Sequence, residues 1–258
     1  MINVLFGGDV IGSAGCDFAI RAVRRLRRDG IDIVVLNGEN SADGNGITRL
    51  STEMLTASCD VITTGNHCFR RKEFMDRFDD LPYVLRPANY PDGAPGSGVY
   101  IVDKGSYRLA VVNICGTSFM DDLDNPFVCM ERILGETDTR NIIVDFHAEA
   151  TAEKRAMGFF LDGRVSAVIG THTHVQTADE TILPNGTAYM TDAGMCGTEL
   201  SVLGVEAELA VKRFRYKMPV HFTEAKGEQF FCGAVISIDE RSGKAVAIRR
   251  VQLREKDI

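Results

Sequence analysis

Short apolar runs alternate with amphipathic segments through the first two thirds of the chain. The apolar runs are rich in β-branched residues and predict buried strands at residues 2–6, 33–36, 61–64, 142–146 and 167–169. The segments between them place apolar side chains three and four positions apart, which predicts helices at residues 17–28, 49–58, 71–78, 127–134 and 152–161. Strands that alternate with helices favour a parallel sheet joined by right-handed crossovers.

Two further regions break this alternation. Residues 98–102 and 107–114 flank a Lys-Gly-Ser turn and predict a hairpin. Towards the C-terminus, strands are predicted at residues 188–191, 220–223, 229–238 and 245–251. The pattern therefore predicts an α/β fold whose core is accompanied by a second, largely antiparallel sheet. We expect one domain over residues 1–258, because no linker, internal repeat or shift in composition divides the chain.

The charge balance restricts the partners that the chain can have. Its 258 residues include 29 Lys and Arg against 36 Asp and Glu, which gives a formal net charge of −7. Tight binding to duplex nucleic acid needs clustered basic side chains, so no such partner is expected. The arginines between residues 21 and 28 lie mostly opposite the apolar stripe of their predicted helix, which indicates a solvated face.

Signals for membranes and secretion are missing from the pattern. No apolar stretch approaches the roughly 20 residues of a membrane-spanning helix, so no membrane partner is expected. The chain begins with a strand-like run and no basic leader, which predicts a cytoplasmic protein. Its seven cysteines are odd in number and include no Cys-x-x-Cys pair, which indicates reduced thiols.

Side chains that can bind metals follow the predicted strands. Each of five strands is followed by such groups, namely Asp9, Glu39 with Asn40, Asn66 with His67, His147, and His172 with His174. Parallel strands end at one edge of their sheet, and open α/β sheets bind ligands at the carboxyl ends of their strands. We therefore expect two carboxylates, two carboxamides and four imidazoles in one crevice. Among the five histidines, only His221 lies outside this set.

Each of these residues has an ordinary structural explanation when it is taken alone. Asp9 could cap a helix, Glu39 could lie in a solvated turn, and a lone histidine is more often a hydrogen-bonded core residue than a ligand. Capping does not explain why all the groups collect at one edge, where each unpaired buried polar group costs about 1–3 kcal/mol. Bound metal ions would satisfy them together.

The number and type of donors predict two metal ions. Eight oxygen and nitrogen donors exceed the four to six ligands of one ion, and His172 and His174 lie on one side of an extended segment. A carboxylate that bridges two ions about 3.5–4 Å apart is typical of two-metal hydrolases. Because the set has no thiolate, it suits iron, manganese, zinc or cobalt. We favour iron or manganese, with zinc or cobalt as alternatives.

At these residues the chain resembles the calcineurin-like dinuclear metallophosphoesterases, with their Gly-Asp, Gly-Asn-His and late His-x-His motifs. Several segments look most like the YmdB-like branch: 38–40 (Gly-Glu-Asn), 86–91 (Arg-Pro-Ala-Asn-Tyr-Pro), 145–151 (Asp-Phe-His-Ala-Glu-Ala-Thr), 170–177 (Gly-Thr-His-Thr-His-Val-Gln-Thr) and 191–195 (Thr-Asp-Ala-Gly-Met). Ile11 and Glu39 stand where the broader superfamily usually has His and Asp. The resemblance implies a sandwich of two mixed β-sheets flanked by helices, with the metal site at the carboxyl ends of the strands.

The resemblance also assigns roles to the candidate residues. It implies that one ion is held by Asp9, Glu39, Asn40 and His174. It implies that the second ion is held by Glu39, Asn66, His147 and His172. Glu39 would then bridge the two ions, and His67 matches the proton donor of the family.

These features predict a metal-dependent phosphodiesterase of cyclic nucleotides, and the resemblance implies 2′,3′-cyclic nucleotides as substrates. The ions would activate a water molecule as the nucleophile, and His67 would protonate the leaving ribose oxygen. A nuclease or phosphomonoesterase on the same ions is one alternative. A non-catalytic, nucleotide-sensing protein is another, although an intact His67 argues against it. An exposed strand edge would allow a homodimer or homotetramer.

Two segments depart from the family pattern. Cys68, Arg70 and Arg71 follow closely after His67 and place extra positive charge near the mouth of the predicted site. Cys196 follows the 191–195 segment. These differences could change the choice of substrate without changing the metal ligands.

Overall fold

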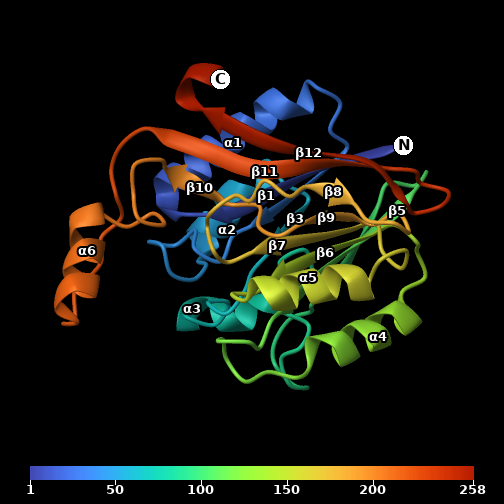
Figure 1. Cartoon of the computed structure of the whole chain (residues 1–258), viewed down its shortest axis with the longest axis horizontal. Coiled ribbons are helices and arrows are strands. Elements are labelled where there is room, and N and C mark those ends of the chain that lie inside the picture. Colours follow the sequence, from blue (N-terminus) through green and yellow to red (C-terminus); the bar gives the residue numbers. More distant parts are fainter.

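Two six-stranded mixed sheets pack face to face, with helices on their outer sides (Figure 1). The computed structural model describes all 258 residues. The first sheet has the spatial order β12-β11-β10-β1-β2-β3, and β11 also pairs with β1. Its strands are β1 (Ile2–Val10), β2 (Ile33–Asn37), β3 (Val61–Thr63), β10 (Met195–Thr198), β11 (Gln229–Ile238) and β12 (Ala245–Arg254). Strands β1, β2, β3 and β10 run parallel, whereas β11 and β12 form an antiparallel margin.

The second sheet has the spatial order β4-β5-β6-β7-β9-β8. Its strands are β4 (Val99–Asp103), β5 (Arg108–Cys115), β6 (Ile142–His147), β7 (Ala167–Thr171), β8 (Thr181–Ile182) and β9 (Ala188–Met190). The four central strands are parallel, and the edge strands β4 and β8 pair antiparallel with their neighbours. The predicted hairpin is confirmed as β4 and β5.

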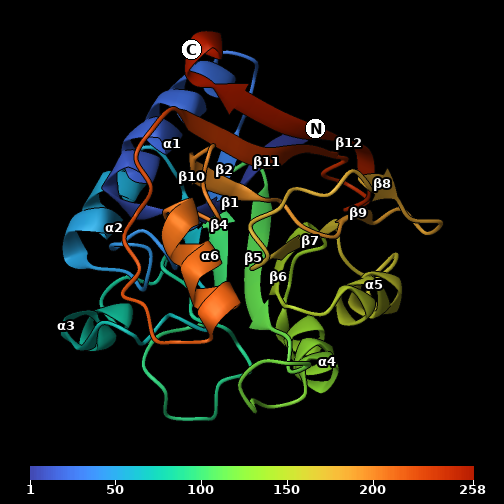
Figure 2. The same cartoon turned by 60° about the vertical axis from the view of Figure 1, so that its left-hand side comes forward.

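Helices cover the outer face of each sheet. The helices are α1 (Gly12–Arg27), α2 (Arg49–Thr56), α3 (Lys72–Met75), α4 (Pro126–Glu136), α5 (Thr151–Phe160) and α6 (Ala207–Tyr216), with 3₁₀ turns at Asp76–Phe78 and Glu255–Asp257. The first three pack with the first sheet and α4 and α5 with the second, whereas α6 projects from the body (Figures 1 and 2). None of these helices combines the length and apolar character needed to cross a bilayer.

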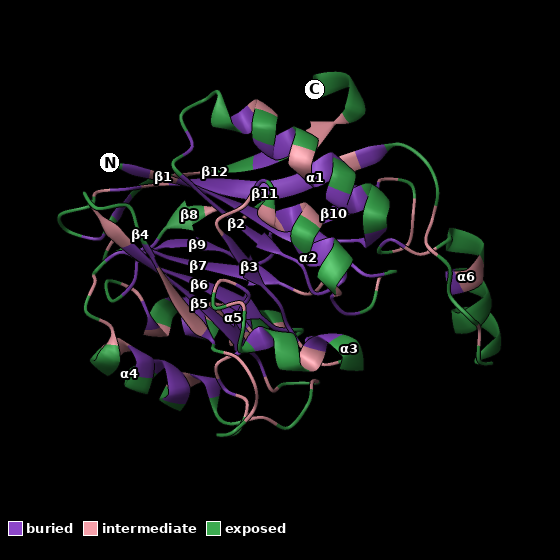
Figure 3. Ribbon diagram, turned by 180° about the vertical axis from the view of Figure 1, so that it is seen from behind, coloured by how far each residue is buried: buried purple, intermediate pink, exposed green.

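The core consists of three apolar layers, and the alternation of side chains along β1 shows how they arise. Val4 and Phe6 point into the layer between the two sheets, whereas Leu5 points into the layer under α1. Val10 also lies in the layer under α1, because the register of β1 shifts between Gly7 and Asp9. A third layer lies between the second sheet and helices α4 and α5. The central strands are therefore buried on both faces (Figure 3), which explains their continuous apolar sequences.

Local sequence signals place the ends of two helices. Thr48 and Ser51 form a reciprocal capping box that starts α2. Asn125 accepts hydrogen bonds from the first backbone N–H groups of α4, and Pro126 occupies the first helical position, where its missing N–H costs nothing. The arginine-rich helix α1 buries Ala19, Ala22, Val23 and Leu26, as the apolar stripe predicts.

Two predictions about the fold were wrong. The five strands expected in one parallel core are divided between the sheets, with β1, β2 and β3 in the first and β6 and β7 in the second. Chain order alone does not reveal this division, because sequential strands need not pair. The strand expected at residues 220–223 is an exposed irregular segment without sheet partners. The sandwich of two mixed sheets that the resemblance implies is confirmed.

Candidate metal centre

The candidate residues gather where the carboxyl ends of strands from both sheets meet. Strands β1, β2 and β3 deliver residues from the first sheet, and β6 and β7 deliver residues from the second. The side-chain amide of Asn37, at the end of β2, donates to Asp145 of β6 across 3.1 Å and joins the two sheets there. The crevice therefore lies between two sheets. The prediction of a crevice at the edge of a single sheet was wrong.

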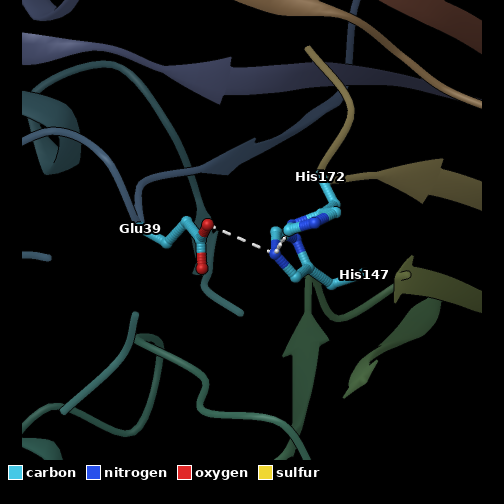
Figure 4. A group of neighbouring side chains, drawn as sticks. All are labelled: Glu39, His147 and His172. Carbon is cyan, nitrogen blue, oxygen red and sulfur yellow. Dashed lines mark hydrogen bonds and ion pairs between the residues drawn. The ribbon is translucent and has the colours of Figure 1, made fainter. Parts of the chain in front are cut away.

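Glu39, His147 and His172 form the centre of the site (Figure 4). Each offers one ligand atom, and these atoms all lie within 4.8 Å of one another. Glu39 Oε1 lies 3.2 Å from His147 Nε2, which in turn lies 3.1 Å from His172 Nδ1. Glu39 and His147 are almost completely buried. This compact group of a carboxylate and two imidazoles is the strongest candidate for metal binding in the chain.

The other predicted ligands surround this centre. Asn66 Oδ1 lies 3.0 Å from His147 Nε2, on the side of the central group. Asn40 Nδ2 lies 3.2 Å from Glu39 Oε1 and 3.1 Å from His174 Nε2. His174 Nε2 is in turn 3.7 Å from Asp9 Oδ1. All seven predicted ligands are thus brought together, in two groups that meet at Glu39.

Each of the three candidate histidine ligands has one ring nitrogen held by an oxygen of the protein. His147 Nδ1 lies 2.9 Å from Thr171 Oγ1, His172 Nε2 lies 3.1 Å from Glu149 Oε2, and His174 Nδ1 lies 3.2 Å from the carbonyl oxygen of Leu203. In every ring the other nitrogen faces the crevice. Such outer hydrogen bonds fix the tautomer of metal-binding histidines, so the arrangement suits three neutral imidazole ligands.

Asp145 fixes this arrangement through hydrogen bonds, and no role was predicted for it from the sequence. Its carboxylate accepts hydrogen bonds from the side chains of Asn37, Thr63 and Thr171. Burial raises the pKa of Asp145 to about 7. The signal in the sequence is an acid inside the apolar run of β6, which is rare unless the group has polar partners.

The buried charges act on one another. Burial alone would raise the pKa of Glu39, but the charge and hydrogen bond of His147 hold this pKa well below its usual range. Burial lowers the pKa of His147, but Glu39 and then Asp9 raise it more strongly, to about 9. Burial and the neighbouring His147 lower the pKa of His172 to about 3, so the ring is neutral at pH 7. Because its Nε2 faces the carboxylate of Glu149, the proton lies on Nε2 and Nδ1 has a free lone pair. Glu39 is thus stabilised by the proton on His147, and a cation bound beside Glu39 would take the place of that proton.

The donor set fits metal ions. Asp9 is completely buried, burial raises its pKa, and its Oδ1 has no hydrogen-bond partner. A buried carboxylate oxygen without a partner is costly, and a cation between Asp9 and His174 would satisfy it. Asn40 now directs Nδ2 at His174 and Oδ1 at His67 Nδ1, so its carboxamide would have to shift for Oδ1 to reach an ion while keeping His67.

The loop that carries His172 and His174 is held by a buried ion pair. Both histidines have left-handed backbone angles, with φ of 99° and 64°, a conformation that costs about 1–3 kcal/mol each. Lys154 Nζ lies 2.7 Å from Asp192 and donates across 2.7 Å to the carbonyl oxygen of Thr171. Asp192 also accepts from the backbone N–H of Thr173 at 3.0 Å. These contacts keep the loop in its strained shape.

His67 lies beside the ligands but opens onto a cavity. Its Nδ1 is 3.0 Å from Asn40 Oδ1, and its backbone N–H donates to Glu39 Oε2 across 3.1 Å. The side chain is 28% exposed and lines a cavity of about 980 Å³. Burial lowers the pKa of His67, and the nearby Glu39 opposes this effect. With Nδ1 held by Asn40, Nε2 is the ring nitrogen available to a ligand in the cavity.

The residues that depart from the family pattern fall into two classes. Cys68 and Cys196 are fully buried in the apolar layer under α1 and do not line the cavity, so direct contact with a substrate there is excluded for both. Arg70 and Arg71 line the cavity together with His67. The extra positive charge near the mouth is therefore confirmed, and the two arginines are the residues that can influence what enters.

A sandwich of two mixed sheets with a His and Glu cluster at the ends of its strands is the architecture of the metallophosphoesterases. The chain belongs to the YmdB-like family, whose model, described as YmdB-like protein, matches residues 5–251. A relative from Bacillus subtilis (strain 168), named 2′,3′-cyclic-nucleotide 2′-phosphodiesterase, is 45% identical over 98% of this chain and 98% of its own length.

Two solved structures are closely similar to this one. A hypothetical protein from Thermus thermophilus is 40% identical with a TM-score of 0.93, and the match covers 98% of this chain and 100% of that one. A protein described as a novel phosphatase from Mycoplasma pneumoniae is 31% identical with a TM-score of 0.93, over 98% of this chain and 93% of that one.

Proposed function

We propose that this protein is a metal-dependent phosphodiesterase that hydrolyses 2′,3′-cyclic nucleotides at the 2′ ester bond. The observation that supports it most is the convergence of Glu39, His147 and His172, with an available His67 at the mouth of a cavity. The name of the Bacillus subtilis relative supports the same activity and substrate class.

The seven predicted ligands fit two ions that share Glu39. Asp9, Asn40 and His174 would complete one site, and Asn66, His147 and His172 the other. When bound, the ions would lower the pKa of water to generate a nucleophile and would offset the charge that develops on phosphate. We favour iron or manganese as the native metal, because the donors are carboxylate, carboxamide and imidazole groups.

His67 is placed to act as the general acid. Hydrolysis adds a hydroxyl group to phosphorus and breaks the bond to the ribose 2′-oxygen, which must gain a proton. The Nδ1 of His67 is held by Asn40, so its Nε2 would deliver that proton from the protonated ring. A lowered pKa makes the imidazolium a stronger acid, although a smaller fraction of it is protonated at neutral pH.

The net charge and the intact His67 argue against the nuclease and the sensor. A nuclease that follows a long polynucleotide needs a basic groove, whereas this chain has a net charge of −7. A non-catalytic nucleotide sensor needs no proton donor beside the ligands. We further propose that residues 1–258 act as one domain, and that the protein works in the cytoplasm, where its seven free cysteines would stay reduced.

A substrate comparison tests the activity. The manganese-loaded protein should hydrolyse 2′,3′-cyclic AMP to adenosine 3′-monophosphate with a higher kcat/KM than single-stranded RNA or a simple phosphomonoester. The products and initial rates can be followed by chromatography. Faster cleavage of internal RNA bonds at physiological salt would favour the nuclease, and binding of 2′,3′-cyclic AMP without hydrolysis would favour the sensor.

A further inference from the structure

The cavity beside His67 adjoins the candidate metal ligands, but other residues line it. Its volume of about 980 Å³ is near the upper end of the range of roughly 300–1,000 Å³ for small-molecule sites. One wall comes from residues 43–45 and the turn at 67–71. The other wall belongs to residues 199–228, called the arm here. The arm includes α6, which projects from the body (Figures 1 and 3). The carbonyl oxygen of Leu203, which lines the cavity from the arm, contacts Nδ1 of His174, so the arm connects the cavity with the candidate ligands.

Two neighbouring arginines line this cavity in different states. The guanidinium of Arg71 is hydrogen-bonded to the neighbouring segment 42–45. It donates to Asp43 at 3.0 Å and to the carbonyl oxygens of Ala42 and Asn45. Arg70 is exposed, and neither an ion pair nor a side-chain hydrogen bond holds its guanidinium. Arg71 therefore supports the wall, whereas Arg70 is free to bind an anion.

The other charged groups of the cavity leave the charge of Arg70 without a partner. Asp43 is engaged by Arg71. The carboxylate of Glu224 packs over Gly12, at the N-terminus of α1, where a Cβ on that glycine would overlap it. Helix N-termini favour such negative charge, which explains the position of Glu224. Arg70 is thus an unpaired cation inside a cavity of an otherwise acidic protein.

Arg70 lies one turn from the candidate proton donor. The backbone N–H of Arg70 donates to the carbonyl oxygen of His67 across 3.0 Å, which closes a tight turn. The Cα atoms of the first and last residues of such a turn are less than about 7 Å apart. Because both side chains line the same cavity, the guanidinium of Arg70 can extend to one side of a ligand held near His67. A nucleotide whose cyclic phosphate lies at the metal ligands and His67 could place a second phosphate at Arg70.

We propose that Arg70 binds a second phosphate group of the substrate and makes the enzyme prefer 2′,3′-cyclic nucleotides that carry one. This inference rests on the proposed phosphodiesterase function for the position of the cyclic phosphate. The planar guanidinium of arginine matches phosphate oxygens through two parallel hydrogen bonds. The second phosphate could be a 5′-phosphate on a mononucleotide or the linking phosphate of a short oligonucleotide that ends in a cyclic phosphate.

Equilibrium binding of product-like probes tests the proposal independently of turnover. The probes are adenosine 3′-monophosphate, adenosine 3′,5′-bisphosphate and the dinucleotide ApAp, measured by calorimetry on the manganese-loaded protein. The variants are Arg70→Gln, Arg70→Lys and, as a control of equal net charge, Arg24→Gln on the exposed face of α1. We expect the wild type to bind at least one doubly phosphorylated probe about tenfold tighter than the monophosphate, as one added charged hydrogen-bonded contact gives.

The variants then separate the outcomes. Arg70→Gln should bring the affinity ratio close to one. Arg70→Lys, which keeps the charge but not the paired N–H groups, should keep only part of the ratio. Arg24→Gln should keep the wild-type ratio. A preference for the bisphosphate alone identifies a 5′-phosphate, and a preference for ApAp alone identifies an oligonucleotide end. Equal ratios in wild type and Arg70→Gln, or a wild type that binds no probe more tightly than the monophosphate, would overturn the proposal. Hydrolysis of 2′,3′-cyclic AMP, measured separately, shows whether the proposed activity itself fails.

Discussion

The Nδ1 atom of His147 lies 2.9 Å from Oγ1 of Thr171, and that hydroxyl donates its own proton to Asp145 across 2.6 Å. Because the hydroxyl proton is used on Asp145, the oxygen of Thr171 must accept a hydrogen bond from His147 Nδ1–H. A neutral His147 therefore presents the lone pair of Nε2 to the crevice. The tautomer of this candidate ligand is thus set by a threonine and an aspartate that do not themselves face the crevice.

Replacing Thr171 by Val should weaken metal binding while the fold is kept. The substitution preserves the shape of the side chain but removes the acceptor for His147 Nδ1–H, and loss of such an outer contact typically costs 10–100-fold in metal affinity. Manganese titration followed by calorimetry measures the effect. Thr56→Val is the control, because the Thr56 hydroxyl bonds only within α2. Unchanged manganese affinity in Thr171→Val would show that the hydroxyl does not orient the ring.

Gly65→Ala should damage the site through crowding. A Cβ at this position would overlap the His147 ring and Oε2 of Glu39, so both groups would have to move. We expect a cost of about 1–3 kcal/mol in the free energy of unfolding and at least a tenfold loss of metal affinity. Urea unfolding and metal titration measure both. Gly135→Ala in α4, where a Cβ has open space, should instead stabilise the protein by about 0.5–1 kcal/mol. Normal metal binding by Gly65→Ala would contradict the close packing.

Lys154→Met should destabilise the whole protein. It leaves Asp192 buried without its ion-pair partner at 2.7 Å and removes the donor to the carbonyl oxygen of Thr171. Breaking a buried pair in this way costs about 3–5 kcal/mol, which urea unfolding can measure. In the double variant Lys154→Met with Asp192→Asn the loss should be smaller, because no uncompensated charge remains. A double variant that is as unstable as the sum of the two single variants would exclude coupling between the two charges.

His67→Gln should keep the metal ions and lose turnover. The side chain faces the cavity, and its loss removes the candidate general acid, which is typically worth 10²–10⁴-fold in rate. Turnover of 2′,3′-cyclic AMP should fall by that factor, but turnover of a nitrophenyl phosphodiester should fall less, since its leaving group needs no proton. Equal losses for both substrates would assign His67 to charge stabilisation, and loss of metal would make it a ligand or a support.

Local patterns in the sequence predicted most elements, because each pattern depends on neighbours along the chain. The apolar run of β6 and the apolar stripe of α1 are examples. Helix α6 was missed although Ala207, Ala210, Val211 and Phe214 recur at helical spacing, and of these four only Ala210 is buried. The division of the parallel strands between two sheets was also missed, since it depends on contacts between segments far apart in sequence.

The candidate ligands could be predicted because each lies at or shortly after the carboxyl end of a strand, where a residue's type and position are both visible in the sequence. The residues that orient these ligands could not be predicted from the sequence. Asp145 acts through Thr171, and Leu203 contributes only a backbone carbonyl oxygen from the arm, which no residue type reveals. Arg70 and Arg71 look equivalent in the sequence, and only their contacts distinguish a free guanidinium from an engaged one.

Stepwise metal loading with a simultaneous rate assay shows whether hydrolysis of 2′,3′-cyclic AMP needs two bound ions. Protein stripped by a chelator is titrated with manganese while bound metal and the hydrolysis of 2′,3′-cyclic AMP are measured on the same samples. We expect no hydrolysis without metal, full activity at two bound ions per chain, and adenosine 3′-monophosphate as product. Glu39→Ala, which lacks the carboxylate shared by the two candidate sites, should bind neither ion tightly. Hydrolysis by the stripped protein, or no hydrolysis at two bound ions, would show that the protein is not a two-metal phosphodiesterase of this substrate.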